Sequence, residues 1–88
     1  MAKLHCNIMG SVQEHETGIL IDGLGLQYES IVDDRLILRT NASNMAKIRV
    51  AIVASDENRA AYLVELPRQV TMGGRRIWVP KTTVEATD

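Results

Sequence analysis

The residues whose types and spacing point most clearly to chemistry lie near the C-terminus. Between positions 68 and 81 the chain has four bases, its only tryptophan and no acid: Arg68, Arg75, Arg76, Trp78 and Lys81. Arginine and lysine bind phosphates, and a tryptophan ring stacks on nucleobases. Together with Arg49, which lies on an earlier predicted strand, these residues form the predicted binding site for single-stranded nucleic acid.

The exposure of Trp78 depends on the register of its strand. In an extended segment, Arg76 and Trp78 lie on one face, and Ile77 and Val79 lie on the other. If Ile77 and Val79 point into the core, Trp78 and Arg76 stand exposed side by side, where they could bind a nucleic acid or anchor a protein partner. In the opposite register, Trp78 packs inside the core, and the arginines are ordinary solvated side chains on the surface.

Other groups that could support catalysis or metal binding lack the usual companions. The cluster His5, Cys6, Glu14, His15 and Glu16 has neither an HxxxH nor an HExxH spacing, and it has no second cysteine for a zinc site. On a strand, His5 and Cys6 point to opposite faces, which disfavours a Cys–His nucleophile pair. We therefore expect a protein that is not an enzyme and that has no cofactor and no metal.

Two shorter patterns also favour structural roles. Gly23-Leu24-Gly25 lacks the third glycine, the following helix and the lysine of a phosphate-binding loop, so it predicts a turn. The neighbouring acids Asp33 and Asp34 lack the repeated oxygen ligands of an EF-hand, and they are typical of a solvated turn.

Length and composition indicate one globular domain over residues 1–88. Apolar residues make up 45% and charged residues 24% of the 88 positions, which is ordinary for a globular protein. A domain of this size is only marginally stable alone, so a partner or a second copy is expected. The alternative function is therefore protein–protein interaction, as a homo-oligomer or as a small regulator or inhibitor of a larger protein.

Charge is unevenly distributed along the chain. Residues 1–34 hold one base and six acids, whereas residues 35–81 hold nine bases and three acids. The split can mark a binding face, or it can mean that the two halves attract each other. The net charge of −1 is low for a dedicated nucleic-acid binder.

The single cysteine and the N-terminal sequence bear on location. A secreted domain of this size usually has several paired cysteines, and this chain has one. Its N-terminus has no apolar segment typical of a secretion signal, and no uninterrupted apolar stretch of the sequence is long enough to span a membrane. We expect a cytoplasmic protein with no membrane partner.

Alternating apolar and polar residues predict several short strands. The segments with this pattern are 4–9, 19–21, 28–32, 35–40 and 47–54, and the acidic pair Asp33-Asp34 is predicted to join two of them as a hairpin. Residues 59–66 also favour a strand; the alternative is a helix that begins near Ser55 and ends before Pro67.

The strongest local prediction is a hairpin that turns at Gly73-Gly74. Glycine supplies the positive φ angles of a two-residue hairpin turn. Residues 69–72 and 75–79 would then pair, with Val70 and Met72 facing Ile77 and Val79. Together the strands predict a mainly β fold: a small barrel of the SH3-like or OB-like type, or a compact two-sheet sandwich, with at most one short helix.

Overall fold

Strands make up most of the described chain. The computed structural model describes residues 2–41, 44–71 and 73–86. The strands are β1 (Ala2–Gln13), β2 (Glu16–Asp22), β3 (Gln27–Asp33), β4 (Leu38–Arg39), β5 (Met45–Asp56), β6 (Ala61–Glu65), β7 (Arg76–Pro80) and β8 (Val84–Ala86). Two three-residue 3₁₀ turns, η1 (Asp34–Leu36) and η2 (Lys81–Thr83), are the helical segments of these residues. The predicted mainly β fold is confirmed.

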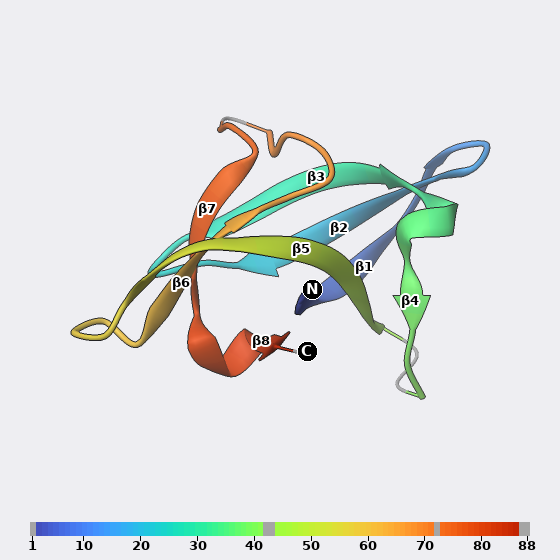
Figure 1. The fold of residues 1–88 in the computed structure, drawn as a ribbon. Coiled ribbons are helices and arrows are strands. Elements are labelled where there is room, and N and C mark those ends of the chain that lie inside the picture. The colour runs from blue at the N-terminus through green and yellow to red at the C-terminus, as the bar shows by residue number, and fades with distance from the viewer. Residues whose placement is uncertain (1, 42–43, 72, 87–88) are drawn as a thin grey trace.

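One antiparallel sheet winds around the core. Its strand order is β3-β2-β1-β5-β6-β7, with β4 added to β5 and β8 added to β1. The long strand β5 belongs to both halves, because Met45–Val50 pairs with β1 and Ala51–Asp56 pairs with β6. Figure 1 shows that the sheet curls strongly into a half-barrel.

The core lies on the concave side and follows the alternation of the strands. Leu4 and Cys6 of β1 and Ile48 and Val50 of β5 point inward, as the alternation predicts. The other fully buried large side chains are Ile19, Ile21, Val32, Val64, Leu66 and Val79. The alternation over 47–54 also predicts that Ile52 and Ala54 point inward with Ile48 and Val50. This prediction is wrong, because both residues are exposed where β5 passes a bulge and extends beyond the core.

The connection between β6 and β7 closes the open side of the half-barrel. Its residues 66–71 cross to β3, where the Ser30 hydroxyl donates to the Gln69 carbonyl (2.9 Å) and the Thr71 N–H donates to the Glu29 carbonyl (2.7 Å). This crossing lies beside β3 in Figure 1. It buries Val70 at 4% exposure, so the connection is anchored by both hydrogen bonds and apolar packing.

The predicted two-residue hairpin at Gly73-Gly74 is wrong. The strand that pairs with β7 is β6, with Val64 opposite Ile77 and Tyr62 opposite Val79. Val70 instead forms a bridge with Ser30 of β3, and Met72 lies outside the described residues. Burial of Val70 draws this segment toward β3, a long-range contact that a local turn pattern does not contain.

The predicted hairpin around Asp33-Asp34 is also wrong. The Asp33 carboxylate accepts the Arg35 backbone N–H (2.9 Å) and caps η1. The chain then enters β4, which pairs with β5 and not with β3. Ile37 is buried and Leu36 is exposed, because the 3₁₀ turn changes which side chains face the core.

Residues 61–65 form a strand, as favoured over the helix. The preceding turn is held by the Asp56 carboxylate, whose Oδ1 accepts the backbone N–H groups of Asn58 (3.0 Å) and Arg59 (3.2 Å). Ala60 completes the reversal with a φ of 51°. This local hydrogen bonding turns the chain before a helix can begin.

Candidate nucleic-acid interface

The register of β7 places Arg76 and Trp78 on the convex side of the sheet. Ile77 and Val79 are buried at 4% and 0% exposure, Arg76 is exposed and Trp78 is half-buried. In the neighbouring strand β6, Leu63 stands opposite Trp78, and Glu65 stands opposite Arg76. We call the convex side of β5, β6 and β7 the outer face.

Trp78 does not present a bare ring to solvent. The guanidinium of Arg59 lies over the indole, with its Cζ 4.6 Å from the ring centroid. Arg59 in turn donates from Nε to Asp56 Oδ2 at 2.7 Å. The aromatic end of the outer face is therefore an indole covered by a cation.

Three of the predicted site bases have carboxylate partners. Arg76 Nε lies 3.1 Å from Glu65 Oε1, and Lys81 Nζ lies 2.6 Å from Glu57 Oε1. Arg68 Nη1 reaches Glu16 Oε2 of β2 at 2.9 Å, so this pair links the acidic first half of the chain to the basic second half. Exposed pairs of this kind contribute about 0–1 kcal/mol each, and they neutralise charge that a ligand would otherwise meet.

Arg49 and Arg75 have no carboxylate partner among the described residues. Arg49 is exposed and stands directly opposite Lys3 of β1. Lys3 has no ion pair among the described residues either, since Glu85, its opposite residue in β8, binds Lys47 and His5. Arg75 donates from Nε to the Leu66 carbonyl (3.1 Å), which leaves its terminal nitrogens for other contacts.

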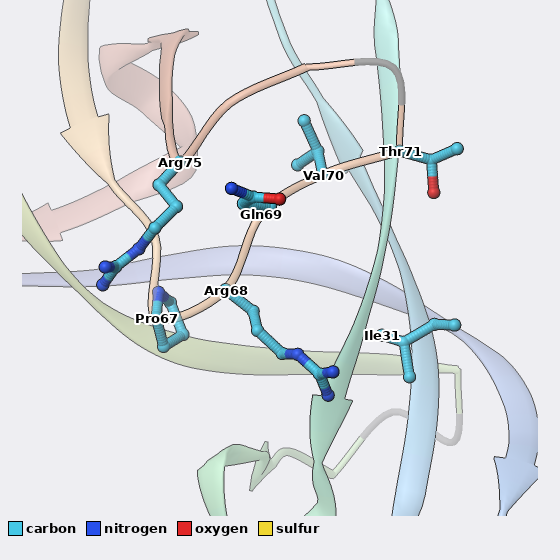
Figure 2. A pocket seen from close by; sticks show the side chains of 7 residues that line it. All are labelled: Ile31, Pro67, Arg68, Gln69, Val70, Thr71 and Arg75. Atoms are coloured by element: carbon cyan, nitrogen blue, oxygen red, sulfur yellow. The ribbon is translucent and has the colours of Figure 1, made fainter.

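Arg49 and Arg75 line one shallow groove, which we call the basic groove. Its other lining residues are Val50, Ala51, Glu65, Leu66 and Pro67. Arg75 also lines a neighbouring hollow, together with Arg68, Ile31, Gln69 and Thr71. Figure 2 shows Arg75 and Arg68 extending from the loop in different directions, with Pro67 between their side chains. The six predicted residues therefore do not form one cluster: Arg75 shares the basic groove with Arg49 and the hollow with Arg68, and Arg76, Trp78 and Lys81 lie on or beside β7.

Of the groups considered for catalysis, His5 and Cys6 point to opposite sides of β1, and His5 stands opposite Lys47 of β5. Cys6 is buried, its thiol contacts the Ala46 carbonyl at 3.7 Å, and burial raises the pKa of that thiol to about 11. His5 points away from the core and lies 3.5 Å from Glu85. Across residues 2–41, 44–71 and 73–86, no three histidine, cysteine, aspartate or glutamate side chains gather as metal ligands would.

The described part of the chain also has no helix of the length and apolar character needed to cross a membrane. Comparisons of the sequence with protein-family models and curated proteins, and of the structure with solved structures, gave no match. The function is therefore inferred from the geometry of the residues themselves.

Sequence reasoning missed two residues of this surface. Lys3 could have been placed outward from the alternation of β1, because Leu4 and Cys6 point inward, but its position opposite Arg49 depends on which strands pair. Arg59 lies within a turn, and no local pattern shows that it lies over Trp78, a residue 19 positions away.

Proposed function

We propose that this protein is a non-enzymatic binding module for single-stranded nucleic acid. In this proposal, Lys3 and the basic groove bind phosphates, and the Arg59–Trp78 end of the outer face receives a base. The observation that carries the proposal is that some bases of this surface are neutralised by a carboxylate and others are not. Arg68, Arg76 and Lys81 have carboxylate partners, whereas Lys3, Arg49 and Arg75 have none among the described residues.

On one side Lys3 stands opposite Glu85 of β8, which is already bound to Lys47 and His5, and on the other side Lys3 stands opposite Arg49. Like charges directly opposite each other on neighbouring strands destabilise a sheet, and these two are Cα partners on one face. A phosphate between them would turn the repulsion into attraction and release counterions. Apolar atoms of Ala51 and Pro67 in the same groove suit the sugar that joins two phosphates.

The register of the strands supports a single strand with unstacked bases. Ala51, Glu65 and Arg76 lie side by side across β5, β6 and β7, and Trp78 follows Arg76 by two residues on the same face. The aromatic end therefore lies about 7 Å from this row, a distance set by the rise of two strand residues. Protein folds that bind single strands combine a basic track and a stacking group in this way.

Fluorescence anisotropy of a labelled oligothymidylate tests the proposal. Arg49→Gln and Arg75→Gln should each weaken binding about three- to tenfold, because each removes a phosphate contact. Arg35→Gln is the matched control, since Arg35 is an exposed arginine that binds Asp33 beside η1. No binding by the wild type, or equal weakening by Arg35→Gln, would contradict the proposal.

A second candidate is protein interaction through the convex side of β1, β2 and β3. Met9, Val12 and Ile31 are exposed there at 57%, 51% and 38%, around a row in which Gly10, Gly18 and Ile31 stand opposite one another. A second copy of the chain would cover these side chains. A standard interface uses roughly 20–30 residues a side, so this small group ranks second.

Light scattering separates the two candidates. A dimer mass that returns to one chain on Met9→Lys would support self-association. A single-chain mass at high protein concentration would exclude it and leave nucleic-acid binding as the function to test.

A further inference from the structure

We propose that the base at the aromatic end stacks on the outward side of the Arg59 guanidinium, and that the Trp78 ring serves as the support beneath it. This inference rests on the proposed function, because it specifies how the same face receives a nucleic acid. It assigns to Arg59 a base-binding role and to Trp78 a positioning role.

The exposure of the two side chains supports this order. Arg59 Cζ lies 4.6 Å from the centroid of the indole, so the guanidinium occupies the ring face that a base would otherwise use. Trp78 is half-buried, whereas the side chain of Arg59 is more exposed and keeps 50% of its surface in solvent. A ligand that approaches the outer face therefore meets the guanidinium before it meets the ring.

Arg59 is held in this position before any ligand binds. Its Nε donates to Asp56 Oδ2 at 2.7 Å, and Asp56 Oδ1 accepts the backbone N–H groups of Asn58 and Arg59. The same turn is tied to the end of β7, because the Lys81 N–H donates to the Ala60 carbonyl at 2.9 Å. Arg59 is thus held at its backbone N–H and at its Nε, and a side chain held in this way loses little conformational freedom when a ligand binds.

The chemistry of guanidinium suits such a role. It is planar, it stacks on bases, and it keeps its positive charge near the phosphates of the strand. Lysine keeps the charge but has no plane on which a base can stack. The alternative arrangement is displacement, in which a base pushes Arg59 aside and stacks on the indole, at the cost of the cation–π contact and the Asp56 pair.

Substitutions of Arg59 distinguish stacking from displacement. Arg59→Lys should weaken binding of oligothymidylate by about fivefold or more, because lysine has no plane on which a base can stack. The same substitution should weaken binding of an abasic oligomer of equal length clearly less than binding of oligothymidylate, because the charge remains and only the stacking plane is lost. Arg35→Lys is the control and should change neither affinity. Arg59→Ala that tightens binding of oligothymidylate would overturn stacking on Arg59 and favour displacement.

The abasic oligomer also separates this inference from the proposed function. Equal affinities of the wild type for the abasic oligomer and for oligothymidylate would overturn the inference and leave phosphate binding in place. Failure of both oligomers to bind would overturn the proposed function and this inference together. Trp78 emission adds a second readout: the ligand should change it more in Arg59→Ala than in the wild type, since Arg59 covers the ring only in the wild type.

Discussion

Lys3 and Arg49 are Cα partners across β1 and β5, and their side chains share the convex side of the sheet. Neither has a carboxylate partner among the described residues. Two like charges in this position oppose folding by a small amount. An anionic ligand that bridges them would stabilise the folded protein.

The first prediction follows from this pair. Arg49→Glu should stabilise the free protein by about 0.2–1 kcal/mol, because it places opposite charges across the two strands, and it should weaken oligonucleotide binding. Urea unfolding measures the first effect and anisotropy the second. Arg39→Glu is the control, since Arg39 stands opposite Ala46 and should gain no such stability. A loss of stability in Arg49→Glu would show that the pair is not repulsive.

The second prediction concerns Gly23, which packs closely against Tyr28 and against the backbone of β7. A Cβ at Gly23 would lie 2.5 Å from the Tyr28 ring and 3.2 Å from the Trp78 carbonyl oxygen. Gly23→Ala should therefore destabilise the fold by about 1–3 kcal/mol, measured by urea unfolding. A Cβ at Gly74 would meet no atom within 4 Å, so Gly74→Ala should be close to neutral. Equal stability of the two variants would contradict this packing.

The strands that could be predicted are those in which apolar and polar residues alternate within a short stretch of sequence. Leu4 and Cys6, Ile48 and Val50, and Ile77 and Val79 are pairs that share one face of a strand, as their alternation indicates, and all six are buried. The same rule placed Trp78 on the face opposite Ile77 and Val79, but it left open which of the two faces points outward. Alternation shows which side chains share a face of a strand, and this requires no knowledge of the neighbouring strands.

The features that could not be predicted depend on contacts between distant residues. Gly73-Gly74 is typical of a hairpin turn, but the bridge between Val70 and Ser30 takes that segment to β3. Asp33 resembles a residue of a tight hairpin turn, yet it caps η1 and lets β4 pair with β5. The position of Arg59 over Trp78 likewise requires β6 and β7 to pair, which no short window of sequence contains.

The third prediction concerns the acid that holds Arg59. The side-chain hydrogen bond from Arg59, aided by backbone N–H groups, lowers the pKa of Asp56 below its ordinary value. The resulting stabilisation is full above the pKa of an unfolded aspartate, and it is lost as the pH falls through the lower folded value. Carboxyl-carbon NMR titration should report this low pKa in the wild type and a value closer to ordinary in Arg59→Gln. An unchanged Asp56 pKa in Arg59→Gln would exclude this hydrogen bond.

The fourth prediction concerns Cys6. Because burial raises the pKa of its thiol to about 11, Cys6 should remain protonated at pH 8 and react slowly with iodoacetamide. Unfolding in urea should restore the reactivity of an ordinary thiol. Fast alkylation of the folded protein at pH 8 would contradict the burial of Cys6 in the core.

The most direct test of nucleic-acid binding on the outer face is the salt dependence of oligothymidylate affinity. Three phosphate contacts through Lys3, Arg49 and Arg75, at about 0.7 each, predict a slope of roughly −2 in log K against log salt. The slope should be shallower by about 0.7 in Arg49→Gln and unchanged in Arg35→Gln. An affinity that does not depend on salt, or no binding at low salt, would contradict the proposed function.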